Sequence, residues 1–185
     1  MQRSSSFVER IIGAMKLDPA TYEDVEHDEG ANGQAVIIVV AVTILSGLAV
    51  AGSGNARIIG SVVSAILGWA VFTLAAYLVG TTILKGPNTS ATFAGVFRAL
   101  GFAYAPSLFS ILGLIPGIGG LIAFVVAIWS LAASVVALRQ SLDVTTGRAI
   151  GIAIVAVLAI ALVLGLVAAV LGIGIVAVDS IVQSA

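Results

Sequence analysis

Five long apolar stretches separated by short polar connectors constrain this chain more than any other feature. The sequence is 60% hydrophobic and only 9% charged over 185 residues. A soluble domain usually carries about 25% charged residues, so this chain cannot cover a water-exposed surface. About 20 apolar residues in a helix cross a hydrocarbon core of about 30 Å. The expected fold is therefore an all-α integral membrane protein.

The expected transmembrane domain is a bundle of five helices within residues 34–178. Its spans are predicted at residues 34–51, 57–84, 92–114, 121–138 and 148–178. The Pro-Gly turn at 115–120 joins the third span to the fourth, and residues 179–185 form a short tail. The fifth stretch is longer than one perpendicular crossing needs, which favours a tilt, a projection or a break.

Residues 1–33 are predicted to lie outside the membrane and to begin with a short amphipathic helix. Ser6 and Glu9 fit a capping box at its start. The apolar face would hold Phe7, Val8, Ile11, Ile12 and Met15. Glu9, Arg10 and Lys16 are expected to face away from it. The helix would pack on the rim of the bundle or lie in the headgroup layer, and the two interpretations are compatible.

Asp18 and Pro19 predict the start of a second short helix, with Asp18 as its N-cap. The acidic residues that follow, within 21–29, could attract a hard cation, but their spacing does not match a calcium-binding loop. A solvated acidic face is the preferred interpretation. One histidine, His27, and no cysteine exclude a multi-histidine or thiolate site within one chain. No metal and no cofactor are expected.

The basic residues predict the orientation in the membrane. Lysines and arginines favour cytoplasmic loops. If the N-terminus is cytoplasmic, that side holds Arg3, Arg10, Lys16, Lys85, Arg98, Arg139 and Arg148. Only Arg57 falls on the far side. We therefore expect a cytoplasmic N-terminus and a C-terminus on the far side. The net charge of −1 gives no reason to expect nucleic acid as a partner.

The third span carries the candidate functional residues Arg98, Gly101, Tyr104 and Pro106. Ionisable side chains inside a span are expensive and often functional. Arg98 would extend to the phosphate of an anionic lipid, or lie within the bundle and bond a backbone carbonyl or a helix C-terminus. Pro106 should kink the span. The hydroxyl of Tyr104 needs an acceptor if it is buried.

Two further details concern backbone groups. Pro106 would free a carbonyl near Phe102, and the hydroxyl of Ser107 or Ser110 could pair with it. The polar connectors supply the expected N-caps of the third and fifth spans, which are Thr89 or Ser90 and Thr145 or Thr146.

The segment Arg98–Pro106 (RALGFAYAP) and residues 115–150 resemble the Yip family of Ypt/Rab-interacting membrane proteins. The family's motif, roughly Gly-Tyr-x-x-x-Pro, is matched by Gly101, Phe102 and Pro106. The sequences LDPATYEDVEHD and GQA and the pattern S-L-x-x-x-x-G-R-A resemble bacterial members. The resemblance implies five spans, a cytoplasmic N-terminus and, for this branch, a prokaryotic plasma membrane. For eukaryotic relatives, the resemblance implies roles in membrane traffic through small GTPases. Their Asp-Leu-Tyr-Gly-Pro motif is missing here, which argues against GTPase binding.

The expected function is non-enzymatic. The sequence has no Ser/His/Asp set, no paired carboxylates within a span, no metalloprotease motif and no phosphate-binding loop. We expect a membrane-organising or partner-binding scaffold. Its candidate partners are the bilayer, an anionic lipid, a membrane protein or a second copy of the chain. The alternative is a transporter or channel for a small solute, an ion or a lipid, with Arg98 and the Pro106 kink lining the path.

Overall fold

The computed structural model describes residues 5–48, 55–163 and 166, and the regular structure of this part of the chain is entirely helical. Two short helices come first, α1 (Phe7–Met15) and α2 (Pro19–His27). The longer elements are α3 (Ala31–Leu48), α4 (Asn55–Leu78) with its π-helical extension η1 (Val79–Ile83), α5 (Phe93–Phe102), the 3₁₀ helix η2 (Ala105–Leu114) and α6 (Gly119–Ser141). A further helix covers Thr146–Val163.

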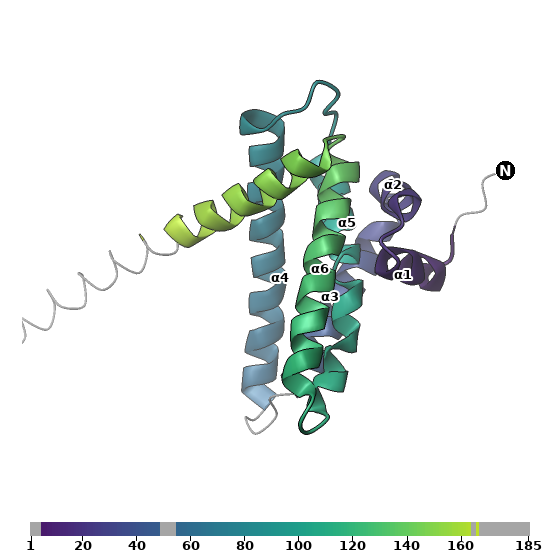
Figure 1. The fold of residues 1–185 in the computed structure, drawn as a ribbon, viewed down its shortest axis with the longest axis vertical. Helices are drawn as coiled ribbons and strands as arrows, with labels where there is room; N and C mark the ends of the chain where they lie inside the picture. Colours follow the sequence, from purple (N-terminus) through teal and green to yellow (C-terminus); the bar gives the residue numbers. More distant parts are fainter. Residues whose placement is uncertain (1–4, 49–54, 164–165, 167–185) are drawn as a thin grey trace, which may run out of the picture.

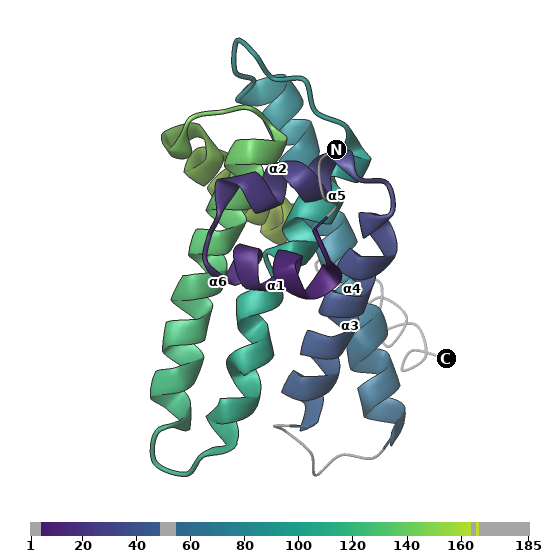
Figure 2. The ribbon, with the colours of Figure 1, turned by 90° about the vertical axis from the view of Figure 1, so that its right-hand side faces the viewer.

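The long helices stand side by side as an upright bundle (Figures 1 and 2). α3 packs against α4, α5 and η2, whereas α6 packs against α5 and η2. α1 and α2 lie across one side of this bundle, with α1 beside η2 and α2 beside α5 and α6. The helix Thr146–Val163 crosses α4 and extends toward the opposite side (Figure 1).

Four helical segments of the described chain are long and apolar enough to cross a membrane. They are Ala65–Ile83, Phe93–Leu114, Gly119–Ser141 and Thr146–Val163. The pair Pro19–His27 and Ala31–Ser46, bent by 120°, brings the number to five if it counts as one span. The predicted all-α membrane bundle is therefore confirmed. The later part of the predicted fifth span and the tail lie outside the described residues.

The two N-terminal caps form as the sequence predicts. The Ser6 hydroxyl accepts from the Glu9 amide while the Glu9 carboxylate accepts from the Ser6 amide, which completes the capping box. The Asp18 carboxylate accepts from the amide of Ala20 at the start of α2, and Pro19 occupies the first helical position. Both helices thus begin where side-chain oxygens replace the missing intrahelical acceptors.

The cap of the third span differs from the prediction. Thr92, rather than Thr89 or Ser90, accepts from the Gly95 amide at 3.0 Å and begins α5. The Thr89 hydroxyl instead accepts from the Gly86 amide within the connector. The polar connector therefore continues two residues beyond Ser90 before the helix begins.

Pro106 changes the type of helix instead of bending a continuous one. In an α-helix its missing N–H would bond the carbonyl of Phe102, and α5 ends at Phe102. The chain then continues as the 3₁₀ helix η2, whose first turn contains Pro106. Ser107 and Ser110 do not act as predicted. Their hydroxyls pair with those of Ser130 in α6 and Ser46 in α3, at 2.8 and 3.2 Å, and so join η2 to its neighbours.

Candidate functional site

Arg98 lies in the middle of α5 and is only 5% exposed. Its Nε donates to the carbonyl of Val25 at 2.9 Å, and one terminal nitrogen donates to the carbonyl of Glu26. The other terminal nitrogen donates to Oδ1 of Asn32 at 3.2 Å. The two carbonyls belong to the last turn of α2, where no intrahelical donor is available. The sequence left two alternatives for Arg98, which were extension to a lipid phosphate and a position within the bundle. The structure places Arg98 inside the protein as a cap on a helix C-terminus.

The side chain of Glu26 contacts α5 from the opposite direction. A Cβ added at Gly95 would lie 2.8 Å from Cγ of Glu26, so the absence of a side chain at Gly95 makes this contact possible. Glu26 is 9% exposed. Burial raises the pKa of its carboxyl to about 7, with smaller effects from the charges of His27, Glu23, Asp143 and Arg98. The junction of α2 with α5 thus contains a carboxyl that titrates near neutral pH.

Arg10 joins α1 to α2 and is 2% exposed. Its guanidinium forms ion pairs with Asp24 at 2.9 Å and with Asp28 at 2.6 Å, and it donates to Oε1 of Gln34 at 3.2 Å. The prediction that Arg10 faces away from the packed side of α1 is wrong, because these acceptors draw it inward. The hydrogen bond from Arg10 also lowers the pKa of Asp28. The acidic segment is therefore partly an internal counter-charge.

Two side chains bond the C-terminus of α1. The buried hydroxyl of Tyr22 donates to the carbonyl of Ala14 at 3.0 Å. The indole Nε1 of Trp129, in α6, donates to the carbonyl of Met15 at 2.7 Å. At the other end of α1, the rings of Phe7 and Phe102 meet edge to face at 6.4 Å. Both ends of α1 are thus fixed to the bundle.

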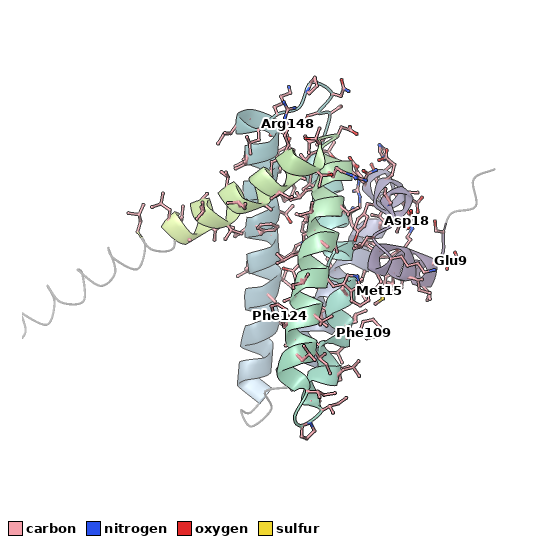
Figure 3. All side chains as sticks on the ribbon, viewed as in Figure 1. Glu9, Met15, Asp18, Phe109, Phe124 and Arg148 are labelled. Atoms are coloured by element: carbon pink, nitrogen blue, oxygen red, sulfur yellow. The ribbon has the colours of Figure 1, made fainter. Side chains whose placement is uncertain are left out.

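The face of α1 opposite the bundle remains open. Val8 is 62% exposed and Ile12, one turn later, is 45% exposed. Figure 3 shows Glu9 on the side of the molecule that faces away from α4, whereas Arg148 lies at the end of the bundle that carries the polar connectors. α1 therefore presents an apolar pair beside charged residues, which is the pattern of a helix in a membrane interface.

Gly101 permits a close approach of α5 to α3 and α4. A Cβ there would lie 2.6 Å from Cβ of Ala35 and 2.8 Å from Cζ2 of Trp69. The Trp69 ring is buried and stacks on Phe97 with a centroid distance of 3.8 Å. Small residues at a helix crossing are a common way to pack helices inside a bilayer.

Tyr104 lies apart from Arg98, in a cleft of about 370 Å³ between α4, α6 and the α5–η2 junction. Pro106 is buried beside it in the chain and does not line the cleft. Arg98, Gly101 and Tyr104 therefore lie at three different places, which are a polar junction with α2, a helix crossing and a cleft, whereas Pro106 only begins η2.

Sequence reasoning missed Arg10, Glu26 and Trp129 as parts of this arrangement. The sequence did contain a signal for Arg10, because the acidic residues of the neighbouring helix α2 could be expected to attract its positive charge. Trp129 gave no signal, since its bond to Met15 joins residues 114 positions apart. No group of three or more histidine, aspartate or glutamate residues that could hold a metal occurs within the described chain.

The fold and the site define a multi-pass α-helical membrane protein whose N-terminal segment is held on the bundle by two buried arginines. The family model of the Yip1 domain matches residues 12–171, and the chain belongs to this family. The match confirms the resemblance seen in the sequence. No curated protein and no solved structure matches the chain.

Proposed function

We propose that this Yip1-family protein acts non-enzymatically as a membrane-organising scaffold, which holds α1 in the cytoplasmic leaflet of a prokaryotic plasma membrane. The bias of basic residues supports this orientation, with the N-terminus in the cytoplasm. The single observation that carries the proposal is the level at which the bundle holds α1.

The contact between Trp129 and Met15 sets this level. Trp129 comes ten residues after Gly119, the start of α6, which corresponds to about 15 Å of helix. A hydrocarbon core is about 30 Å thick. On the side of α1, the apolar surface between α1 and the far end of the bundle therefore covers only about half of a bilayer.

The difference between this short apolar surface and the full thickness of the hydrocarbon core affects the lipids beside α1. Glu9 and Lys16 are exposed on α1 and need water, whereas Val8 and Ile12 favour acyl chains. A bilayer next to a short apolar surface becomes thinner, at a cost of fractions of a kcal/mol per Å. α1 would thus displace lipid headgroups and thin one leaflet locally, which supports a role in organising membrane shape or composition.

Cryo-electron microscopy of proteoliposomes tests this proposal, with local bilayer thickness and vesicle diameter as the readouts. The variant Val8→Glu/Ile12→Glu should remove α1 from the acyl region and restore the thickness of protein-free bilayer. The matched control Glu9→Gln/Lys16→Gln keeps the apolar pair and should behave like the wild type. Equal thickness beside the wild type and the Val8/Ile12 variant would contradict the proposal.

The same N-terminal segment is the proposed contact surface for a membrane-protein partner or a second copy. Its outer side has a shallow recess lined by Ala20, Glu23, Asp24, His27 and Asp28. Cross-linking in native membranes should capture a partner that is lost when residues 1–17 are deleted.

The position of Arg98 gives the transport alternative no support, because its donors are taken by α2 and Asn32. GTPase binding is not proposed.

A further inference from the structure

The cleft beside Tyr104 has walls from three parts of the fold. Phe72 of α4 forms one wall, and residues of α6 form the other. Residues around the α5–η2 junction make its floor: Leu100, Ala103, Tyr104 and Ser107. Its volume of about 370 Å³ lies within the range of ligand pockets, roughly 300–1,000 Å³. The surface is mostly apolar with a few hydroxyls, as expected for a site that receives a hydrocarbon chain with one polar group.

Some hydroxyl groups of the cleft have a hydrogen-bond partner among the described residues, and one does not. Ser107 and Ser130 pair with each other at 2.8 Å, and Ser134 donates to the carbonyl of Ser130 at 2.9 Å. The Tyr104 hydroxyl donates to none of the described residues, although the side chain lines the cleft. A phenol O–H in an apolar medium gains from an acceptor, and hydrocarbon offers none. A molecule that enters the cleft with a carbonyl oxygen would supply this acceptor.

The cleft opens toward the lipid. Leu131, on its outer wall, is 68% exposed, and its neighbour on α6, Ile128, is 53% exposed. Both belong to the membrane-crossing segment Gly119–Ser141. A molecule that enters from this side must come from the bilayer, which favours a lipid over a soluble ligand.

The depth of the hydroxyls matches one polar group of membrane lipids. Arg139, at the end of α6, is expected at the level of the lipid phosphates. Ser134 precedes it by five residues, which corresponds to about 8 Å along the helix. Each interfacial layer of a bilayer is roughly 5–8 Å thick. Ser134 and its neighbour across the cleft, Tyr104, therefore lie near the boundary of headgroups and hydrocarbon, where acyl ester groups are found.

We propose that this cleft binds an acyl chain of an ester-linked membrane lipid, with the Tyr104 hydroxyl donating a hydrogen bond to the ester carbonyl oxygen. Phe72, Leu100 and Leu131 contact the methylene groups. The cleft would recognise the ester group and the acyl chain, and the headgroup of the lipid would remain outside the cleft. This site is independent of the role of α1, because α1 lines no part of the cleft.

Photo-cross-linking in nanodiscs tests the site. The probe is a diacyl phosphatidylglycerol with a diazirine on one acyl chain, and peptide mass spectrometry locates the adducts. Wild-type protein should be labelled on residues of the cleft. A diester lipid should compete with the probe better than a diether lipid with the same headgroup, because the diether lacks the carbonyl.

Three variants separate the site from ordinary lipid contact. Tyr104→Phe keeps the ring and should weaken competition by the diester by about twofold to tenfold, the effect of one hydrogen bond. Ala127→Phe fills the mouth of the cleft and should reduce labelling there more than tenfold. Ile128→Phe adds the same ring one position away, outside the cleft, and should have no effect. Equal competition by diester and diether, or cleft labelling unchanged by Ala127→Phe, would overturn the proposal.

Discussion

Replacement of Arg98 by methionine tests the Arg98 clamp, by which we mean the hydrogen bonds from Arg98 that hold the end of α2 on the bundle. Methionine keeps an unbranched apolar side chain and removes every donor. Two carbonyls at the end of α2, those of Val25 and Glu26, then lose their partner. Each buried acceptor left unpaired costs about 1–3 kcal/mol. Water can reach the exposed side of this turn, so we expect the lower part of the combined range, about 2–3 kcal/mol.

Hydrogen–deuterium exchange in nanodiscs measures this effect directly. A loss of about 2–3 kcal/mol should accelerate opening of the amides of α2 by roughly 30- to 150-fold. The amides of α6 should not change. Arg139→Met is the matched control, because the guanidinium of Arg139 bonds only the side chain of its neighbour Gln140 among the described residues. Arg98→Lys should fall between wild type and Arg98→Met. Unchanged exchange of α2 in Arg98→Met would refute the clamp.

Two further substitutions probe the junction and the helix crossing. Because burial raises the pKa of Glu26 from 4.5 to about 7, its contribution to the docking of α2 is complete below pH 4.5 and is lost as the pH rises through 7. A spin label on Ala20→Cys should therefore gain mobility between pH 5 and 8, with a change on the order of 100-fold in the docking equilibrium. Glu26→Gln should abolish this pH dependence. A dependence that persists in the variant would count against the role of Glu26. Gly101→Ala should destabilise the bundle by about 1–3 kcal/mol in thermal unfolding, since the new Cβ meets Ala35 and Trp69. Gly147→Ala, with nothing within 4 Å, is the control, and equal melting of the two variants would contradict the close approach.

The features that depend on local chemistry could be predicted from the sequence. The caps at Ser6 and Asp18 and the helical nature of the apolar stretches follow from neighbouring residues and from hydropathy. The 3₁₀ helix after Tyr104 shows the limit of such reasoning. Pro106 signals an interruption, but whether the chain bends or changes its helix type depends on packing of η2 against α3 and α6.

The candidate site depended on contacts that are distant in the sequence. Arg98 was recognisable as an intramembrane charge, yet its partners in α2 lie more than 70 residues earlier. Arg10 was misjudged because a helical wheel of α1 alone does not include Asp24 and Asp28. A pair of helices must be placed together before such counter-charges become visible.

The depth of α1 in the membrane is the most direct test of the account. The chain has no cysteine, so a nitroxide on Ile12→Cys reports from one position only. Its collision rates with oxygen and with a water-soluble nickel complex, measured in nanodiscs, give the depth. We expect it about 5–10 Å below the phosphates of the locally thinned leaflet. The same label on Ala20→Cys should remain in water. A label on Ile12→Cys as accessible to nickel as the one on Ala20→Cys would contradict the proposal that the bundle holds α1 in the membrane.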